Sequence, residues 1–309
     1  MSDAPEISVV IPCLNEADNA AGIAAAVKSE LVRSATSHEI IFIDNGSTDG
    51  TVDLIKALCA NDPSIRLIVN NQNYGQMRSP THAIYQATGQ AVIAMCADFQ
   101  DPPELISPFI DLWRRGRPIV LGVRQSEQSP LFNRILRRAG YAFFSTFGDY
   151  KVIPDATGFG IYSREVVDCL RRWRDPEPFF RGMLVESGYD ITTIAYERPA
   201  RLRGTTKNNL STLVSFAVSG IASSSKRLLR APMYIAFAGF ILIIPLLLIA
   251  FVFPGALWRG FAVALLDLLF SMTFLFMGLI GEQLRIVAEI VRNTPLVVEK
   301  ERVNFPPAI

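Results

Sequence analysis

Two carboxylates mark the sharpest change of character in the chain, within the segment AMCADFQDPPE at residues 94–104. The apolar run before them stops at Asp98 and Asp101, and the two prolines that follow prevent a strand from continuing. A carboxylate placed directly after a buried strand costs free energy unless something pairs with it. Because Mg²⁺ is usually held by one or two carboxylates together with substrate phosphates, we expect Asp98 to bind a divalent cation. For Asp101, a role in a turn or as the cap of the next helix is at least as good an interpretation as a role as a cation ligand.

The chemistry around Asp98 includes no obvious strong base. The sequence has two histidines, His38 and His82, and neither stands in a motif that would support a nucleophile. A cation at Asp98 would instead neutralise the charge that builds on a departing diphosphate. The acidic segment therefore predicts Lewis-acid chemistry on a phosphorylated substrate.

The segments that must position these residues alternate between strand and helix patterns. The predicted strands occupy residues 7–11, 39–43, 65–70, 90–95, 118–123, 157–163 and, within a longer segment, 189–201. The predicted helices occupy residues 20–32, 51–60 and 79–88. This alternation indicates an α/β fold with a mostly parallel sheet and helices on both faces. Ligands of such sheets bind at the carboxyl ends of the strands, which is where Asp98 stands.

Two further polar clusters follow predicted strands. Pro12 closes the first strand and Asn15 and Glu16 come shortly after it, while Asp44 and Gly46 follow the second strand. Taken singly, each cluster is an ordinary β-to-α turn in which the glycine serves backbone geometry. Their shared position at one edge of the sheet makes them candidate ligand-binding residues.

Two apolar segments, residues 233–253 and 261–281, are each 21 residues long, and the second contains one charge, Asp267. As helices they would measure about 31 Å, enough to cross a hydrocarbon core. Basic residues flank the pair, whereas the connection between them carries only Arg259, so the positive-inside rule places both termini in the cytoplasm. We expect a multi-pass protein of the inner (cytoplasmic) membrane with its catalytic part facing the cytoplasm. The N-terminus resembles no signal peptide.

These patterns divide the chain into four parts. They are a cytoplasmic catalytic domain at 1–208, an amphipathic interfacial helical region at 209–232, a two-helix transmembrane hairpin at 233–281 and a cytoplasmic tail at 282–309. The net charge of +1 argues against a partnership with nucleic acid. Four scattered cysteines without C-x-x-C spacing fit a reducing compartment and predict no zinc site.

A series of motifs occurs in a recognisable order before the two apolar segments. They are VVIPCLNE, IDNGSTDGT, NQNYGQ, ADFQDPPELI, GVR, DATGFGIYSR and RGTTKNN. In this order they resemble the inverting family 2 glycosyltransferases of the polyprenyl-phosphate sugar synthase type, which include dolichol-phosphate mannose synthase and bacterial undecaprenyl-phosphate glycosyltransferases. The resemblance implies a GT-A fold, a nucleotide-diphosphate sugar as donor, Mg²⁺ or Mn²⁺ as cofactor, and a polyprenyl phosphate as acceptor at the membrane. It also suggests a homo-oligomer, since related hairpin-anchored enzymes often form tetramers.

The resemblance further implies roles for individual residues. Those near the donor nucleoside would be Pro12, Asn15, Glu16, Asp44 and Gly46, and Asp155 would be either a turn residue or a contact of a sugar hydroxyl. Asp98 and Gln100 match the metal-site positions of the family pattern. Arg203 and Lys207 would hold phosphates near the membrane, and Arg124 with Arg134 or Arg138 would receive the lipid phosphate. The expected catalytic residues are Asp98, Arg124, Arg203 and Lys207. Arg134 and Arg138 could equally face anionic lipid headgroups.

The chain departs from the family pattern at three places. Cys96 and Asn45 stand where the family usually has aspartate, and the segment with Arg78, Pro80 and His82 replaces a helix of small residues. A thiolate prefers softer metals than Mg²⁺. These departures leave open a shifted donor specificity or an impaired catalysis.

A phosphate monoester is already largely anionic at neutral pH, so such an acceptor can attack an anomeric carbon without a strong general base. The site must then supply orientation and positive charge around two sets of phosphate oxygens. This chemistry agrees with what the resemblance implies, an inverting hexosyltransferase that acts on polyprenyl phosphate, and we expect that activity. Two alternatives stay open: a glycosyltransferase with a hydroxyl acceptor, which needs a general-base carboxylate, and a catalytically silent relative that binds a nucleotide or lipid as a membrane partner.

Overall fold

The computed structural model describes residues 4–34, 36–125, 153–197, 199 and 256–305. The chain divides into two units. The first contains residues 1–138, 151–208 and 293–309 and includes the sheet, and the second contains residues 139–150 and 209–292.

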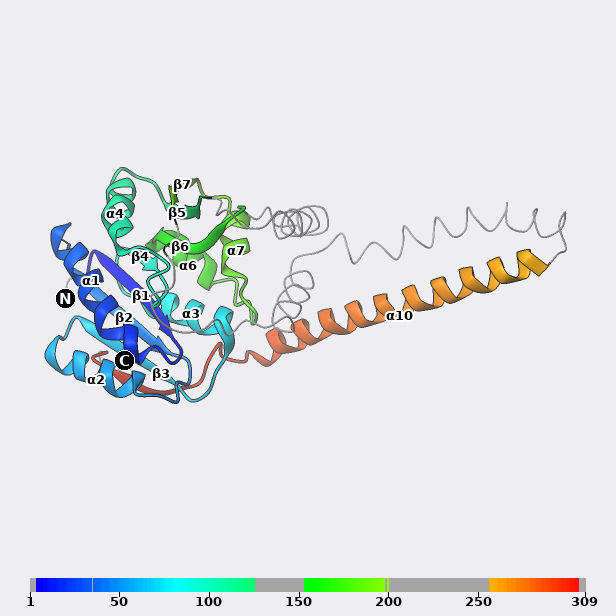
Figure 1. The fold of residues 1–309 in the computed structure, drawn as a ribbon, viewed down its shortest axis with the longest axis horizontal. Coiled ribbons are helices and arrows are strands. Elements are labelled where there is room, and N and C mark those ends of the chain that lie inside the picture. Colours follow the sequence, from blue (N-terminus) through cyan, green and yellow to red (C-terminus); the bar gives the residue numbers. More distant parts are fainter. Residues whose placement is uncertain (1–3, 35, 126–152, 198, 200–255, 306–309) are drawn as a thin grey trace. The chain divides into compact units, whose positions relative to one another are not determined.

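The first unit is built on a sheet of eight strands in the order β7-β5-β6-β4-β1-β2-β3-β8 (Figure 1). The strands are β1 (Ile7–Cys13), β2 (His38–Asp44), β3 (Ile65–Asn70), β4 (Ala91–Ala94), β5 (Ile119–Arg124), β6 (Ala156–Ser163), β7 (Ile191–Tyr196) and β8 (Glu299–Val303). β1 pairs in parallel with β2 and β4, β2 with β3, and β5 with β7. β6 runs antiparallel to β4 and β5, and β8 antiparallel to β3. The prediction of a mostly parallel sheet is confirmed.

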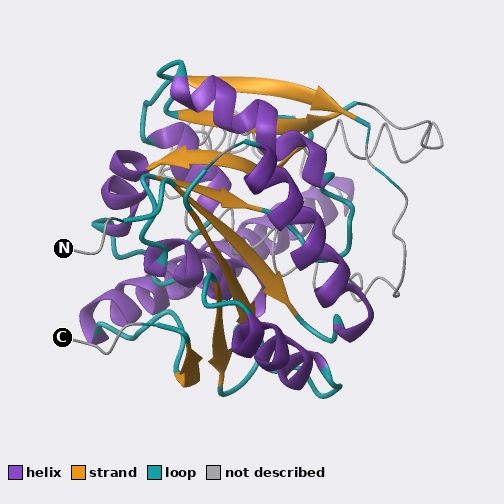
Figure 2. Cartoon of the chain, turned by 90° about the vertical axis from the view of Figure 1, so that its left-hand side faces the viewer, coloured by secondary structure: helices purple, strands orange, loops and turns teal. Residues whose placement is uncertain are grey.

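Helices cover both faces of this sheet, as Figure 2 shows. They are α1 (Ala17–Arg33), α2 (Thr51–Asn61), α3 (Gly75–Gln86), α4 (Ile106–Arg114) after the short 3₁₀ turn Pro103–Leu105, α6 (Arg164–Arg171) and α7 (Phe180–Glu186). Residues of α1, α2 and α4 pack against Val9 and Ile11 of β1 on one face, and residues of α3, α6 and α7 share the cluster of Val10 on the other. Because both faces are covered, the central strands are continuous apolar runs rather than alternating ones.

The helix after β3 begins earlier than its sequence predicts. The prediction started it at residue 79, at the beginning of the segment SPTHAIYQAT. In the structure α3 begins at Gly75 and includes Pro80 in its interior. The extra turn brings the start of the helix to the NQNYG segment that follows β3.

The C-terminal residues return to the sheet as β8, which the sequence analysis did not predict. β8 pairs with β3 from Leu67 opposite Val303 to Asn70 opposite Glu299. Its sequence, EKERV, contains four charged residues and no apolar alternation, so periodicity gives no strand signal. β8 follows α10 (Ala256–Arg292) in the chain, and the residues between them, 293–298, already belong to the first unit.

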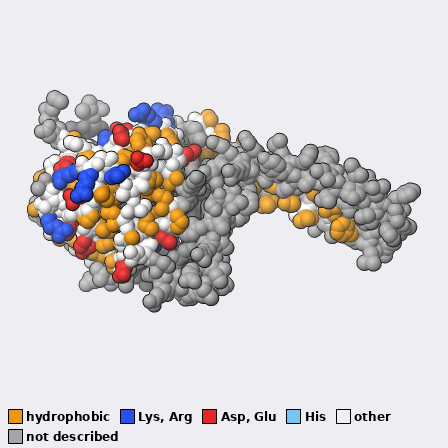
Figure 3. Space-filling model, turned by 90° about the horizontal axis from the view of Figure 1, so that it is seen from above, with side chains coloured by type: hydrophobic (Ala, Val, Ile, Leu, Met, Phe, Trp, Pro, Cys, Tyr) orange, Lys and Arg blue, Asp and Glu red, His pale blue; other side chains and the backbone are white. Residues whose placement is uncertain are grey.

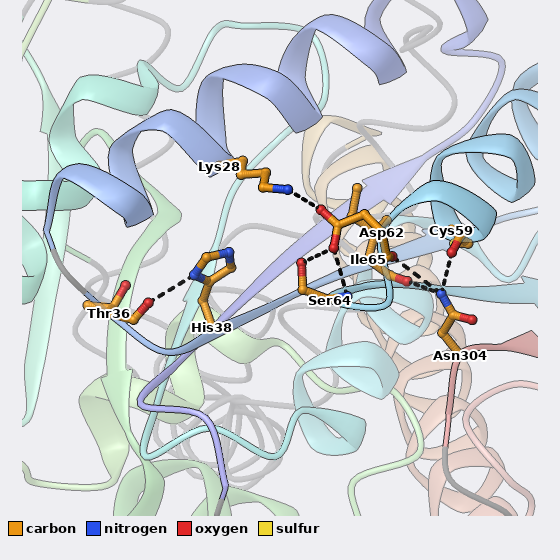
Figure 4. A network of polar contacts seen from close by, with 8 residues as sticks. All are labelled: Lys28, Thr36, His38, Cys59, Asp62, Ser64, Ile65 and Asn304. Atoms are coloured by element: carbon orange, nitrogen blue, oxygen red, sulfur yellow. Dashed lines mark hydrogen bonds and ion pairs between the residues drawn. The ribbon is translucent and has the colours of Figure 1, made fainter.

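Polar side chains attach this C-terminal segment to the sheet unit. Asn304 Nδ2 donates to the carbonyl oxygens of Cys59 at 2.7 Å and Ile65 at 2.8 Å (Figure 4). Lys56 forms an ion pair with Glu301 at 2.6 Å. The contacts reach β8 from α2 and from the start of β3, so the segment is fixed on more than its backbone pairing.

The described part of the second unit is the 37-residue helix α10, whose surface bears apolar side chains (Figure 3). Its segment Leu268–Ala288 has the length and composition to cross a membrane, and only 12% of its most apolar window is buried. The predicted second span, 261–281, lies within this helix, which continues to Arg292. The first predicted span and the interfacial region at 209–232 lie outside the described residues.

Candidate functional site

The carboxyl ends of β1, β2, β4, β5 and β7 meet at one edge of the sheet. Cys13 at the end of β1 is in register with Asp44 at the end of β2, and Arg124 at the end of β5 is in register with Tyr196 at the end of β7. β4, which leads to Asp98, pairs in parallel with β1. The structure thus brings the polar segments after β1, β2 and β4 to the same edge, as the sequence predicted, and β5 brings Arg124 to that edge as well.

The loops after β1 and β2 are bound to each other through backbone and side-chain groups. The backbone N–H of Asn15 donates to Ser47 Oγ at 2.8 Å, and Asn15 Oδ1 accepts from the backbone N–H of Thr48 at 2.8 Å. The backbone N–H of Glu16 donates to Thr51 Oγ1 at 2.9 Å. Asn15 has a φ of 55°, a left-handed conformation that asparagine adopts more readily than most residues. The described contacts of Asn15 and Glu16 therefore shape the loop, and Pro12 lies half-buried within β1 before it.

Asp44 is buried, with an exposure of 1%, and one of its two carboxylate oxygens accepts hydrogen bonds. Its Oδ2 accepts from the backbone N–H groups of Gly46 at 3.1 Å and Ser47 at 3.0 Å, which closes a tight turn. Its Oδ1 is buried and has no hydrogen-bond partner among the described residues. A buried oxygen without a donor costs about 1–3 kcal/mol, so this atom is suited to accept from a ligand.

The side-chain amide of Asn45 holds the NQNYG segment after β3, a role that the sequence analysis missed. Its Nδ2 donates to Asn73 Oδ1 at 2.8 Å and to the Gly75 carbonyl at 3.2 Å. Its Oδ1 accepts from the backbone N–H of Tyr74 at 2.9 Å and from Asn70 Nδ2 at 3.3 Å. An aspartate could not make the two donations. The departure from the family pattern at Asn45 therefore has a structural cause in this chain.

Asp98 and Gln100 lie in one tight turn after β4. Asp98 is 6% exposed, and its Oδ1 accepts from the backbone N–H of Gln100 at 3.2 Å. Phe99 between them has a φ of 59°, which is strained for an aromatic residue and persists only where packing holds it. A Cβ atom at Gly22 would lie 3.3 Å from the Phe99 ring, which shows how closely α1 packs on the turn. The strain is thus supported by a defined neighbour.

Asp101 is buried at 2% exposure, and both of its oxygens accept hydrogen bonds. Oδ2 accepts from the backbone N–H of Cys96 at 2.9 Å, and Oδ1 from the hydroxyl of Tyr196 at 3.2 Å. Burial raises the pKa of Asp101, while the hydrogen bonds and the charge of Arg124 act against the rise. The capping interpretation is wrong, because the next helical turn follows Pro102 without a side-chain cap. Asp101 instead joins the end of β4 to the end of β7.

Cys96 lies beside this carboxylate. The negative charge of Asp101 raises the pKa of the Cys96 thiol well above its usual value, and that of Asp98 adds to the rise. The thiol is therefore protonated near neutral pH, and a protonated thiol is a poor metal ligand. Among the described residues no group of three or more His, Cys, Asp or Glu side chains is arranged to hold a metal. A hard cation at Asp98 and Gln100 would depend on substrate phosphates for its remaining ligands, which is how Mg²⁺ is commonly held.

Arg124 and Asp155 are brought together by β5 and the start of β6. The backbone N–H of Arg124 donates to the Asp155 carbonyl at 3.2 Å, and Asp155 has a φ of 60°. The Nε of Arg124 is buried and has no hydrogen-bond partner among the described residues. The guanidinium lies beside the hydroxyl of Tyr196, where its charge acts against the rise in the tyrosine pKa that burial causes. The remaining predicted basic residues lie outside the described part: Arg134, Arg138, Arg203 and Lys207.

Arg78 and His82, which the sequence analysis associated with donor specificity or impaired catalysis, contact the C-terminal segment. Arg78 donates from Nε to the Leu296 carbonyl and from a terminal nitrogen to the Pro295 carbonyl, each at 2.9 Å. His82 Nε2 lies 2.5 Å from Glu299 Oε1. These departures from the family pattern therefore provide anchors for residues 295–299.

A mixed α/β sheet whose carboxyl edge gathers buried carboxylates, amides and an arginine is typical of enzymes that bind a phosphorylated ligand at the strand ends. Residues 8–171 match the sequence profile described as glycosyl transferase family 2. The chain belongs to that family. The expected α/β fold of GT-A type is confirmed by the sheet and by this match.

Named relatives cover nearly the whole chain. It is 30% identical to an uncharacterised glycosyltransferase of Synechocystis sp., over 94% of this chain and 93% of the relative. It is 29% identical to a prophage bactoprenol glucosyl transferase homologue of Escherichia coli, with 90% and 92% covered. Identity to the SfII prophage-derived bactoprenol glucosyl transferase of Shigella flexneri is 28%, with 97% and 100% covered.

Solved structures resemble the chain more loosely. Glucosyl-3-phosphoglycerate synthase from Mycobacterium tuberculosis, crystallised with Mn²⁺, uridine diphosphate and glucosyl-3-phosphoglycerate, is 22% identical, with a TM-score of 0.47 over 71% of this chain and 78% of that one. A mannosyltransferase from Pyrobaculum calidifontis, in complex with GDP-mannose and Mn²⁺, is 15% identical, with a TM-score of 0.44 over 94% and 88%.

Proposed function

We propose that the protein transfers a hexose from a nucleotide-diphosphate sugar to a polyprenyl phosphate such as undecaprenyl phosphate, with inversion of the anomeric centre. The observation that carries the proposal is the similarity to bactoprenol glucosyl transferases along almost the full chain, which includes the acidic turn after β4. Membership of glycosyl transferase family 2 supports sugar transfer as the class of reaction.

The donor nucleoside binds at the ends of β1 and β2 in this proposal. The buried Oδ1 of Asp44 accepts from an N–H or hydroxyl group of the nucleoside, since no described residue donates to it. Pro12, Asn15, Glu16 and Gly46 shape the surrounding loops. A Cβ atom at Gly46 would lie 3.0 Å from the backbone nitrogen of Asn73, so the glycine lets the two loops approach closely.

Asp98 and Gln100 would hold the divalent cation, Mg²⁺ or Mn²⁺, together with the donor diphosphate. A cation held there would supply Lewis-acid stabilisation of the charge on the nucleoside diphosphate as it leaves. The turn at Phe99 fixes the position of Asp98 before the ligand binds, so binding costs little conformational entropy at Asp98.

Arg124 receives the acceptor phosphate. A guanidinium presents several N–H donors in a planar fork that matches phosphate oxygens, and the buried Nε of Arg124 is available among the described residues. Because the acceptor is already anionic, the reaction needs no general base. Asp155, whose carbonyl accepts from the backbone N–H of Arg124, would contact a sugar hydroxyl. Further contacts to phosphate groups would come from four basic residues outside the described part of the chain: Arg134, Arg138, Arg203 and Lys207.

The lipid acceptor fits a membrane location. The segment Leu268–Ala288 of α10 is one candidate span in the described part of the chain, and residues 233–253 supply a second by their sequence. We propose an inner-membrane enzyme with a two-helix hairpin at 233–281, an interfacial region at 209–232, and a catalytic domain that faces the cytoplasm. We propose a homo-oligomer, such as a tetramer, as its assembly.

The purified full chain in detergent, supplied with undecaprenyl phosphate, Mg²⁺ or Mn²⁺ and a panel of nucleotide sugars, tests the proposal. We expect release of nucleoside diphosphate together with a sugar-phosphate lipid whose anomeric configuration is opposite to that of the donor. A lipid alcohol in place of the phosphate should give no product. Transfer to the alcohol at an equal rate would overturn the acceptor, and no turnover with any donor would favour a silent relative.

A further inference from the structure

Asp101 joins the end of β4 to the end of β7 at the site edge. Its Oδ2 accepts from the backbone N–H of Cys96, which follows β4, and its Oδ1 accepts from Tyr196, the last residue of β7. Tyr196 is in register with Arg124, the last residue of β5. A single buried carboxylate therefore lies between the acidic turn and the arginine proposed to receive the acceptor phosphate.

The ring of Tyr196 has little freedom to move its hydroxyl elsewhere. It packs edge-on against Phe159, with ring centroids 5.7 Å apart and an interplanar angle of 81°. Phe159 in turn packs edge-on against Phe109 at 4.9 Å, in the core under α4. A Cβ atom at Gly122 would lie 3.0 Å from the Tyr196 ring, so the ring also covers β5 closely. The hydroxyl is thus held at Asp101 by packing as well as by its hydrogen bond.

The charges at this junction are complementary. A buried carboxylate requires donors and a nearby cation. Asp101 has the Cys96 N–H and the Tyr196 hydroxyl as donors, and Arg124 supplies the positive charge that acts on it. Arg124 keeps its buried Nε unpaired among the described residues. The arrangement holds the guanidinium at the edge without using all of its donors.

We propose that Asp101 and Tyr196 are positioning residues that orient Arg124 toward the phosphate of the acceptor. The inference rests on the proposed function, and it gives Asp101 and Tyr196, which were not among the predicted site residues, a role in binding the acceptor. Because Asp101 also holds the backbone after β4, the pair sets the spacing between Asp98 and Arg124. Misplacement of a catalytic group by about 1 Å can cost about a hundredfold in rate, so this spacing matters.

The variant Tyr196→Phe tests the pair, because it removes one hydroxyl and keeps the ring packing. We expect farnesyl phosphate, a soluble polyprenyl phosphate, to bind about tenfold more weakly by calorimetry, and kcat/KM for undecaprenyl phosphate to fall by at least as much. The matched control is Tyr162→Phe. Tyr162 is fully buried and donates to the Gly158 carbonyl, so this variant also loses a buried hydroxyl but should leave acceptor binding unchanged.

A double-mutant cycle separates positioning from general destabilisation. If Tyr196 acts through Arg124, then Tyr196→Phe should have almost no further effect on farnesyl phosphate binding in an Arg124→Ala background. Asp101→Asn should behave in the same way. Equal losses in both backgrounds, or the same loss in Tyr162→Phe, would overturn the proposal.

The outcomes also separate this inference from the proposed function. If the wild-type chain binds farnesyl phosphate and the double-mutant cycle shows the expected coupling between Tyr196 and Arg124, but no sugar is transferred, the positioning pair is supported and the transferase proposal is refuted. A chain that transfers sugar to undecaprenyl phosphate but shows additive effects in the cycle refutes the pair alone. A wild-type chain that neither binds farnesyl phosphate nor transfers sugar refutes both.

Discussion

The side-chain amide of Asn45 donates to Asn73 Oδ1 at 2.8 Å and thereby fixes the segment after β3 against the loop after β2. Asn45→Asp would remove this donor and place a carboxylate opposite the oxygen of Asn73. We expect the folded state to lose about 1–3 kcal/mol and the donor nucleotide to bind more weakly, since Asp44 and Gly46 adjoin the loop. Thermal unfolding and calorimetry with nucleoside diphosphate check this. Asn61→Asp on the exposed side of α2 is the matched control, and an equal effect there would contradict the role of Asn45.

Asp98→Asn keeps the shape of the side chain and removes its charge. If Asp98 holds the cation, turnover should fall by about a hundredfold or more, because a charge-stabilising group at the reaction centre is lost. Binding of nucleoside diphosphate should also lose its dependence on Mn²⁺, which calorimetry with and without EDTA measures. Asp111→Asn, on an exposed position of α4, should change neither quantity. Metal-dependent binding that survives in the Asp98 variant would contradict the assignment.

Cys96→Asp would restore the aspartate that the family usually has at this position. The new carboxylate would lie beside Asp101, and two neighbouring carboxylates repel each other unless a cation or proton intervenes. We expect a lower melting temperature than wild type in EDTA and a larger stabilisation by Mg²⁺ or Mn²⁺. Cys169→Asp, on α6, provides a control for the added charge. Identical metal responses in wild type and Cys96→Asp would show that position 96 does not adjoin a cation.

Gly46→Ala should destabilise the protein through the backbone and through contact. Gly46 has a φ of 83°, and an added Cβ would lie 3.0 Å from both the nitrogen of Asn73 and the carbonyl carbon of Gln72. The strained conformation alone costs about 1–3 kcal/mol for a residue with a side chain. Gly50→Ala is a close control, because nothing lies within 4 Å of its added Cβ. A melting temperature lowered equally in both variants would contradict the explanation.

The contact between His82 and Glu299 should make the docking of β8 sensitive to acid. Burial tends to raise the pKa of Glu299, but the hydrogen bonds from His82 and Arg302 outweigh it and lower the pKa to about 2 from 4.5. A lowered pKa in the folded state stabilises the protein above the unfolded value, and the contribution is lost as pH falls from about 4.5 toward about 2. Glu299→Gln should therefore be less stable than wild type at pH 7, and the difference should shrink on acidification.

Melting temperatures between pH 7 and pH 3 measure this effect. Glu301→Gln removes another ion pair of the same strand, with Lys56, and serves as a comparison. A constant gap between wild type and Glu299→Gln across that range would show that the carboxylate of Glu299 has an ordinary pKa.

The central strands could be predicted from the sequence because their residues carry the signal locally. β1 contains the apolar run Val9–Ile11 and β2 the apolar run Ile40–Ile43, since both faces of the sheet are covered there. β8 could not be predicted, because Glu299–Val303 is mainly charged and its partner β3 is distant in the chain. The start of α3 was misplaced: the predicted helix began at residue 79, whereas α3 begins at Gly75 and contains Pro80 in its interior.

The positions of the candidate site residues followed from where strands end, but their contacts did not. Asn45 reaches Asn73 across 28 positions of sequence, Tyr196 reaches Asp101 across 95, and His82 reaches Glu299 across 217. No local pattern specifies such pairs. The family pattern has aspartate at the positions of Asn45 and Cys96, so the sequence suggested only that two negative charges were missing. In the structure the Asn45 amide donates hydrogen bonds that an aspartate could not donate. The Cys96 thiol lies beside the carboxylate of Asp101.

The position of β8 at one margin of the sheet has a consequence for solubility. It occupies main-chain groups of β3 that would otherwise be open to pairing with another polypeptide, and unprotected strands of this kind promote aggregation. β8 itself is short and charged, which discourages a further strand from adding to it. A chain that stopped at Arg292 would leave the apolar β3 bare, so the last residues shield the molecule from association with its own copies.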